Sequence, residues 1–165
     1  MGLITYKPTT PSFRKTVKID KSVLFKGRPE KSLVEELQPN SGRNNTGKIT
    51  IRHRSGGHKK KYRIINFKRN TFDKIGTVER IEHDPNRSAF IALIDYQDLK
   101  EYIIAPSDIK IGDKIISSLK TDISSGNAMK IKHIPTGTSV HNIELKPGAG
   151  GKLCRSAGSF AQVLG

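Results

Sequence analysis

The sequence predicts an all-β protein that begins with a basic arm. Short segments rich in β-branched and aromatic residues recur at roughly ten-residue spacing between positions 48 and 118. Turn-forming residues separate these segments, and no stretch has the sustained apolar period of a long helix. Regular short strands of this kind favour a small closed or partly closed β-barrel.

The predicted barrel strands differ in character along the chain. The segment 76–84 is rich in β-forming residues although its apolar alternation is poor, and the segment 88–96 is apolar almost throughout. Between them lies Asp84-Pro85-Asn86, which is a strong turn signal. The predicted strands are 48–53, 62–67, 76–84, 88–96, 100–106 and 113–118.

Residues 1–47 have the composition of an extended arm. Four prolines punctuate this segment, and Ser, Thr, Asn and Gly fill the gaps between them. One short helical turn is expected over 32–37, because Ser32 could cap it with Glu35 three residues later. Few apolar residues offset the entropy of ordering, so we expect the arm to be disordered in the isolated chain unless a partner orders it.

A second β block begins near Gly126. A turn leads into a predicted strand over 139–145, and a Gly-rich loop follows over 146–153. The block is too short to close a core of its own, so we expect its apolar side chains to need a further segment for burial.

The charge of the chain gives the first indication of function. It holds 30 Lys or Arg against 15 acids, with a net charge of +15 and a pI near 10.1. Residues 1–70 hold 18 of the basic residues and only four acids, whereas the remainder is nearly balanced. Such a chain repels itself unless a polyanion neutralises it, which indicates nucleic acid or an anionic membrane as partner. A membrane is disfavoured, because no apolar run approaches the roughly 20 residues that span a bilayer.

The strongest local signal is the basic segment Arg52–Arg69. Its Lys and Arg side chains can neutralise phosphates, and Gly56 and Gly57 lack the Cβ that would keep a sugar-phosphate chain away from the backbone. Tyr62 offers a ring on which an unpaired base can stack. A solvated charged hairpin is the alternative interpretation, but in so basic an arm we favour nucleic-acid contact.

Other motifs indicate no catalytic residue, metal or cofactor. Gly42–Lys48 matches part of a phosphate loop, but Ile49 stands where Ser or Thr would hold magnesium. The histidines lack the spacing of a zinc helix, and Cys154 has no partner cysteine, so we expect neither a metal site nor a disulfide. No nucleophile elbow or convincing carboxylate pair is present, so we predict that the chain is not an enzyme. Two alternatives stay open. One is an RNA-modifying enzyme that carries an oligonucleotide-binding domain, and the other is a free module that binds single-stranded nucleic acid.

Three stretches resemble the universal large-subunit ribosomal protein two family. Gly42–Asn70 resembles its Gly-Arg-Asn, Gly-Gly-His-Lys, Tyr-Arg and Phe-Lys-Arg pattern. Residues 79–96 resemble its Ile-Glu-x-Asp-Pro-Asn-Arg segment, and residues 134–162 resemble its Pro-x-Gly-Thr-x-x-His-Asn-Ile-Glu segment and the Arg-Ser-Ala-Gly that follows. The similarity runs over essentially the whole chain, in order and with the expected spacing.

The resemblance implies a fold and a function. It implies an extended basic arm over 1–47, an oligonucleotide-binding (OB) barrel over 48–125 and the start of an SH3-like barrel over 126–165. It also implies a structural constituent of the large ribosomal subunit, which binds rRNA beside neighbouring ribosomal proteins and supports subunit association and the peptidyl-transferase region. No cofactor and no membrane partner are implied. The residues expected to contact rRNA are Arg14, Lys15, Arg28, Arg43, Lys48, Arg52, His53, Arg54, Gly56, Gly57, His58, Lys59, Lys60, Lys61, Tyr62, Arg63, Lys68, Arg69, Arg87, His141, Lys152 and Arg155.

The chain departs from the family pattern at a few places. Ser55 stands where a further Gly is usual, and Asn66 stands where Asp is usual. The family continues past Gly165, so we expect either a truncated chain or, as the favoured alternative, a second chain that supplies the C-terminal half. Lys is twice as frequent as Arg, which is typical of an AT-rich gene. We therefore expect a mitochondrial, organelle-encoded ribosomal protein, with the bacterial cytoplasm as the alternative location.

Overall fold

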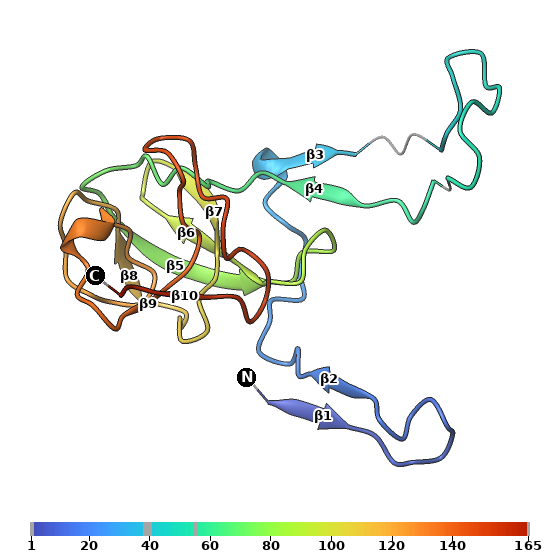
Figure 1. Cartoon of the computed structure of the whole chain (residues 1–165), viewed down its shortest axis with the longest axis horizontal. Helices are drawn as coiled ribbons and strands as arrows, with labels where there is room; N and C mark the ends of the chain where they lie inside the picture. The colour runs from blue at the N-terminus through green and yellow to red at the C-terminus, as the bar shows by residue number, and fades with distance from the viewer. Residues whose placement is uncertain (1, 38–40, 55, 165) are drawn as a thin grey trace.

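A computed structural model describes residues 2–37, 41–54 and 56–164, and it confirms the all-β fold class. Ten strands and two short 3₁₀ turns lie in those ranges, with no α-helix among them. Figure 1 shows a curved body from which two thin extensions project, one near the N-terminus and one that includes strands β3 (Val34–Glu36) and β4 (Lys61–Arg63).

The body is built on a four-stranded antiparallel sheet with the strand order β7-β6-β5-β8. Its register pairs Ile81 with Ala92 and Leu93 with Tyr102. A bulge that follows Val78 interrupts the pairing of β5 with β6 and helps the sheet to curve. The strands are β5 (Ile75–Glu82), β6 (Ile91–Asp95), β7 (Lys100–Ile104) and β8 (Lys114–Ile116). They match four of the predicted strands to within a few residues.

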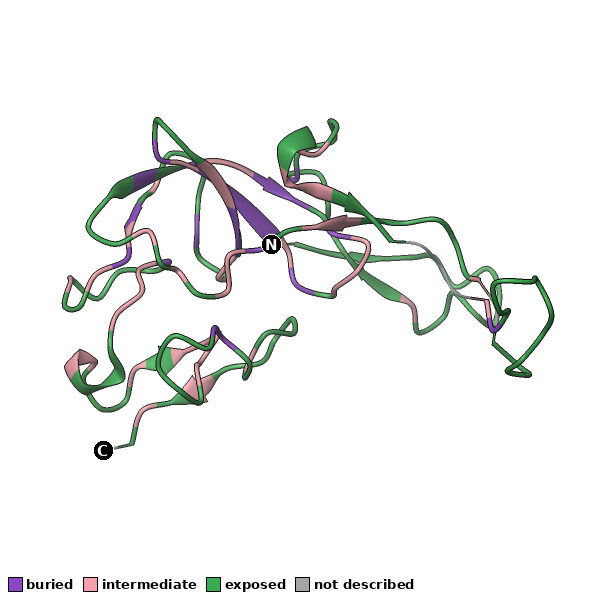
Figure 2. Ribbon diagram, turned by 90° about the horizontal axis from the view of Figure 1, so that it is seen from above, coloured by how far each residue is buried: buried purple, intermediate pink, exposed green. Residues whose placement is uncertain are grey.

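Apolar clusters cover both faces of the sheet at strands β6 and β7, and Figure 2 shows buried residues in purple along the sheet. Ala92 and Ile94 of β6 belong to one apolar cluster, whereas Ile91 and Leu93 belong to the other. A strand buried on both faces needs apolar residues at every position, which explains why this segment does not alternate. The first cluster comprises Leu24, Val78, Ile81, Ala92, Ile94, Tyr96, Ile103, Ile109 and Ile115, and the second comprises Ile65, Ala89, Ile91, Leu93, Tyr102 and Ile104.

The N-terminal arm is extended, and part of it joins the body. Strands β1 (Leu3–Thr5) and β2 (Val17–Ile19) form an antiparallel hairpin whose residues are all exposed. Further along, Leu24 is buried in the first core cluster, and the backbone N–H of Phe25 donates to the carbonyl of Ile81 at 2.8 Å. The arm therefore supplies one side chain of the hydrophobic core.

The predicted helical turn over 32–37 is wrong. A single 3₁₀ turn, η1 (Lys31–Leu33), leads directly into strand β3 (Val34–Glu36), which pairs with β4 (Lys61–Arg63). Ser32 does not cap this turn, because no side-chain cap bond is present. Pairing with β4 takes up backbone groups of β3 that a continuing helix would use.

Two of the strands predicted for the barrel need correction. The predicted strand 48–53 is wrong, since this segment makes only an isolated bridge, between Arg43 and Ile49, before it turns. Its β-forming residues lie at the exposed end of a loop, where no neighbouring strand offers a ladder of hydrogen bonds. Of the predicted strand 62–67, only the first two residues lie in a strand, at the end of β4. Ile65 adds a single parallel bridge to Tyr102 of β7.

The C-terminal block contains little regular structure. Turn η2 (Ile131–His133) is followed by the two-residue strands β9 (Ser139–Val140) and β10 (Ala161–Gln162), which pair with each other. The predicted strand 139–145 is thus reduced to β9 and an isolated bridge from Ile143. None of the buried hydrophobic side chains in the described ranges comes from this block, which agrees with its expected lack of a separate core.

The block is nevertheless attached to the sheet. Ala128 donates to the carbonyl of Ile116 at 3.1 Å and accepts from the N–H of Ser118 at 3.0 Å. The Asn127 side chain also accepts from the N–H of Ile116 at 2.9 Å. These bonds continue the edge of the sheet beyond β8.

Candidate nucleic-acid interface

The loop between β3 and β4 carries a long stretch without acidic residues. No Asp or Glu occurs from Leu37 to Phe72. In Figure 1 the two paired strands lead away from the body, and the loop forms the far end of this extension. Almost every described residue from 41 to 60 is exposed. The structure thus presents a concentrated positive charge on a projection, where a polyanion can reach it.

The end of this loop is held by its own hydrogen bonds. The Gly42 carbonyl accepts from the backbone N–H groups of Thr50 and Ile51 at 2.8 and 3.1 Å. The Asn44 side chain accepts from the N–H of Lys48 at 2.9 Å, as Asn does in turns. Gly42 has φ +70°, and a Cβ there would lie 2.5 Å from the Ile51 carbonyl oxygen, so the turn needs glycine.

The predicted glycine pair lies beside three lysines. Gly56 and Gly57 line an open hollow of about 330 Å³ in which three lysines outnumber one carboxylate; its other lining residues are Glu36, Leu37, Lys59, Lys60 and Lys61. A Cβ on Gly56 would come within 2.6 Å of the Ser41 hydroxyl, so this glycine also allows the two sides of the loop to approach. Ammonium groups around a backbone without side chains suit a phosphate.

A buried carboxylate organises the arginines next to the loop. Asp84 is fully buried, and its Oδ2 accepts from Arg87 Nε at 2.5 Å, while Arg63 Nη1 lies 3.8 Å from its Oδ1. The Arg87 guanidinium is 5.8 Å from the ring centroids of both Tyr62 and Phe67. Tyr62, the residue expected to stack on a base, therefore already has a cation near its ring. The Arg63 side chain is 11% exposed, so most of it faces the protein.

Phe67 connects this cluster with the C-terminal block. The Arg155 guanidinium lies 4.6 Å from its ring centroid, at the distance of a cation–π contact. The carbonyl of Phe67 accepts from the N–H of Gly151 at 2.9 Å. Residues from the two halves of the chain therefore meet at one aromatic ring.

Two other predicted contact residues are largely enclosed. Arg69 donates from Nε to the Ser117 hydroxyl at 3.1 Å and from Nη2 to the Gly126 carbonyl at 2.8 Å. Burial lowers the pKa of its guanidinium. Burial likewise lowers the pKa of His141, which favours the neutral imidazole. The structure gives both side chains contacts within the protein.

The remaining predicted contact residues differ in exposure. Lys68 and Lys152 are exposed, and Arg87 is half-buried in the Asp84 cluster. Of the predicted contact residues in the arm, the long loop and the start of β4, the exposed basic ones are Arg14, Lys15, Arg28, Arg43, Lys48, Arg52, His53, Arg54, His58, Lys59, Lys60 and Lys61. No group of three or more potential metal-ligating side chains occurs in the described ranges. No helix long and apolar enough to cross a membrane is found in the same part of the chain.

Comparison with protein-family models covers most of the chain. Residues 30–117 match the model described as the RNA-binding N-terminal domain of ribosomal proteins L2, and residues 124–165 match the C-terminal domain of the same proteins. The chain belongs to the ribosomal protein L2 family. The resemblance seen in the sequence is thereby confirmed.

Individual members of the L2 family are similar along the full length of this chain. Proteins named large ribosomal subunit protein uL2 from Ruegeria pomeroyi and Paracoccus denitrificans are each 58% identical to it, and the one from Acidiphilium cryptum is 55% identical. All three matches cover 100% of this chain but only 59–60% of the relative. The chain thus spans about three-fifths of the length of these curated relatives.

Asn66, which departs from the L2 family pattern, has a clear role in the structure. Its Oδ1 accepts from the N–H groups of Lys68 and Arg69 at 3.1 and 2.8 Å, and this turn places Arg69 at φ +52°. Its Nδ2 donates to Glu101 Oε2 at 2.8 Å. An amide satisfies both sets of partners, whereas an Asp at this position would bring a second carboxylate to Glu101.

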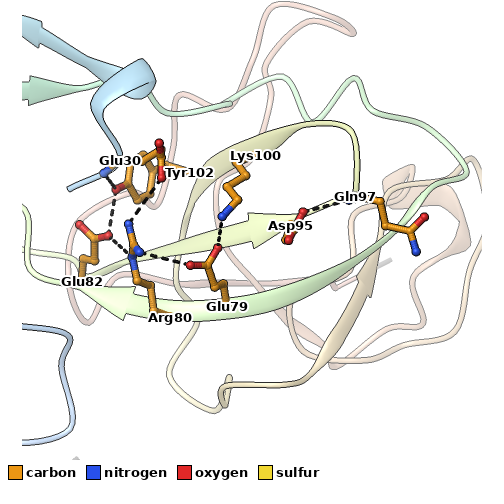
Figure 3. Close-up of polar contacts among 8 residues, drawn as sticks. All are labelled: Glu30, Glu79, Arg80, Glu82, Asp95, Gln97, Lys100 and Tyr102. Carbon is orange, nitrogen blue, oxygen red and sulfur yellow. Dashed lines mark hydrogen bonds and ion pairs between the residues drawn. The ribbon is translucent and has the colours of Figure 1, made fainter. Parts of the chain in front are cut away.

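Sequence reasoning missed the side chains that support the interface. The sequence indicates Asp84 only as part of a turn. Its spacing of three residues from Arg87 was the available signal for the ion pair between them. The network in Figure 3 is a second example, in which Arg80 Nε donates to Glu82 at 2.7 Å and Lys100 donates to Glu79 at 2.7 Å. In the sequence, Glu79 and Glu82 appear only as residues of the predicted strand 76–84, with no assigned partner.

In the same network, Tyr102 links the sheet to the arm. Its hydroxyl donates to Glu82 Oε1 and accepts from the backbone N–H of Glu30, both at 2.9 Å. The Arg80 guanidinium also lies 4.4 Å from the ring centroid of Phe25, an arm residue whose backbone forms a parallel bridge with Glu82. The point at which the arm leaves the body is therefore fixed by several polar contacts.

Proposed function

We propose that this chain is a structural component of the large ribosomal subunit that binds rRNA. Its membership of the L2 family and the acid-free loop beyond β3 support this function. The loop offers guanidinium and ammonium groups at high density on an exposed projection, which is the arrangement that phosphate neutralisation requires. Neighbouring ribosomal proteins are the other proposed partners, and a role in subunit association and near the peptidyl-transferase region is part of the proposal.

The proposed domain division follows the sequence. It assigns 1–47 to the basic arm, 48–125 to the OB domain and 126–165 to the beginning of the SH3-like domain. The first boundary falls within the loop that joins the paired strands β3 and β4. The arm residues Leu24 and Phe25 pack on the proposed OB domain, so they act as its extension.

We propose a purely structural role rather than an enzymatic one. Acids near the interface take part in ion pairs and hydrogen bonds that hold the protein together, as Asp84 and Glu82 illustrate. For location, the bacterial relatives agree with a bacterial ribosome. The mitochondrial location rests only on the excess of Lys over Arg, and it stays a prediction, as does a second chain.

The salt dependence of RNA binding tests the phosphate contacts. Replacing Lys60 with Ala should weaken binding to unrelated RNAs similarly and reduce the log–log salt slope by about 0.7–0.9. Lys120→Ala, outside the loop, is the matched control and should leave the slope unchanged. A slope that is the same in both variants would count against phosphate contact by this loop.

Ribosome association tests the proposed function itself. The tagged chain should stay with the large subunit in a high-salt gradient although salt weakens each phosphate contact, because an assembled component also has contacts that do not depend on charge. Recovery of the chain only as free protein at every salt concentration would overturn the ribosomal assignment. Recovery of the free chain together with RNA that it has chemically modified would instead favour the enzyme alternative.

A further inference from the structure

The end of the β3–β4 loop has a hollow that phosphate binding does not explain. Residues 41–54 enclose an open space of about 620 Å³, lined by Ile49 and Ile51 together with Arg43, Arg52 and Arg54. Its volume lies within the range of about 300–1,000 Å³ that is typical of small-molecule sites. Because the loop contains no acid, each arginine there is free of an acidic neighbour in sequence.

The two isoleucines are unusually placed for such a charged loop. Ile49 is 63% exposed and Ile51 is 52% exposed, and they lie two residues apart on the same hollow. A single exposed isoleucine is ordinary. Two that share a hollow with three arginines form a surface that is both apolar and cationic.

This surface is held in shape before any ligand arrives. The Gly42 carbonyl fixes Thr50 and Ile51, and Arg43 Nη1 donates to the Gly47 carbonyl at 2.8 Å. Arg43 and Ile49 also form an antiparallel bridge across the loop. A preformed site loses less conformational entropy on binding than a flexible loop would.

A nucleotide with a free base matches the chemistry of this site. Its base has two flat apolar faces, and its phosphates carry the negative charge that arginines bind. Within a duplex those faces are covered by neighbouring base pairs, so only an unpaired nucleotide can present one to a side chain. We propose that residues 41–54 bind a single unpaired nucleotide, with its base against Ile49 and Ile51 and its phosphates held by the surrounding arginines. This inference rests on the proposed RNA-binding function and specifies the form of RNA that the loop takes.

Affinity measurements with two RNA hairpins test the inference. One hairpin is fully paired, and the other is the same molecule with one unpaired adenosine in the stem. The full chain should bind the second about fivefold more tightly in fluorescence anisotropy, since part of each isoleucine side chain becomes buried. Ile49→Ser or Ile51→Ser should abolish this preference without changing the salt slope. Ile111→Ser, at a 59% exposed isoleucine outside the loop, is the matched control and should retain the preference.

The outcomes separate the inference from the proposed function. Salt-dependent binding of both hairpins with equal affinity, or a preference that survives in both loop variants, would overturn the nucleotide site and leave RNA binding intact. Failure to bind either hairpin would overturn both. With 4-thiouridine at the unpaired position, photocrosslinking should modify the tryptic segment Ile49–Arg52 or its neighbours within 41–54. Crosslinks confined to peptides outside 41–54 would also refute the site.

Discussion

Replacing Tyr102 with Phe is expected to destabilise the body and loosen the arm. The side chain is fully buried in the second core cluster, and only its hydroxyl is polar. That hydroxyl donates to Glu82 and accepts from the backbone N–H of Glu30. Burial raises the pKa of Tyr102 to about 12, so the hydroxyl keeps its proton at any pH near neutrality. The substitution removes both bonds and keeps the apolar ring in place.

The size of the effect follows from the two bonds that are lost. A hydrogen bond to a charged group contributes about 1.5–3 kcal/mol to stability, and one between neutral groups contributes about 0.5–1.5 kcal/mol. Glu82 is 3% exposed, so its carboxylate cannot easily replace the lost donor with water. We therefore expect the free energy of unfolding to fall by about 2–4 kcal/mol, a substantial part of the roughly 5–15 kcal/mol typical of a domain.

Urea unfolding of the free chain measures this difference, and hydrogen exchange locates it. Exchange at Phe25 and Glu30 should accelerate more than exchange in β6, because the arm loses its contact with the sheet. Tyr96→Phe is a matched control: the Tyr96 hydroxyl is buried but has no hydrogen-bond partner among the described residues. Its removal breaks no hydrogen bond to a described residue and takes an unpaired hydroxyl out of the interior, so the unfolding free energy should not fall.

A similar loss in both variants would refute this reasoning, since it would show that the aromatic hydroxyl matters through packing and not through its bonds. An unchanged unfolding free energy in Tyr102→Phe would refute it equally. Faster exchange throughout the sheet, with no additional change in the arm, would contradict the proposed attachment while leaving the stability estimate intact.

Three further predictions concern other parts of the chain. Asn66→Asp should cost about 1–3 kcal/mol in urea unfolding at neutral pH, because it places a second carboxylate against Glu101, and adding Glu101→Gln should recover most of the loss. Because burial lowers the pKa of His141, the unfolded chain binds that proton more readily than the folded one. Stability should therefore fall as the pH drops below about 6.5, and less steeply in His141→Gln; an identical pH dependence would contradict this. In hydrogen exchange on the free chain, residues 24–36 should be protected and residues 3–19 should not, since a lone two-stranded hairpin is marginal; uniform exchange would disprove this division.

The central strands could be predicted because burial leaves a pattern in the sequence. The continuous apolar run of β6 reflects two buried faces, and the turn at Asp84 marks where β5 ends. Strands β1 and β10 left no comparable signal, since they are short, largely exposed and paired with one partner each. The misassigned segment 48–53 shows the reverse case, in which β-forming residues lack a neighbouring strand.

The interface was predictable in composition but not in the roles of individual residues. A lysine cluster such as Lys59–Lys61 is exposed in nearly any fold, so the sequence alone indicates its availability. Arg63 and Arg69 look equivalent to it in the sequence but turn inward, because Asp84 and Ser117 come from distant parts of the chain. Long-range pairing decides which basic side chains stay accessible to a partner and which support the protein.

The acid-free loop also bears on how long an unassembled copy survives. Its exposed lysines and arginines are the residues after which trypsin-like proteases cut, and exposed loops are where such enzymes gain access. Among the described residues, the base of the loop is held by the short pairing of β3 with β4 and by a bond from Asn86 Nδ2 to the Lys61 carbonyl, so cleavage within the loop does not require the sheet to unfold. RNA bound along the same residues would shield them. The segment proposed to bind RNA would thereby limit the lifetime of copies that have none, which would tie the amount of protein to the amount of RNA available to hold it.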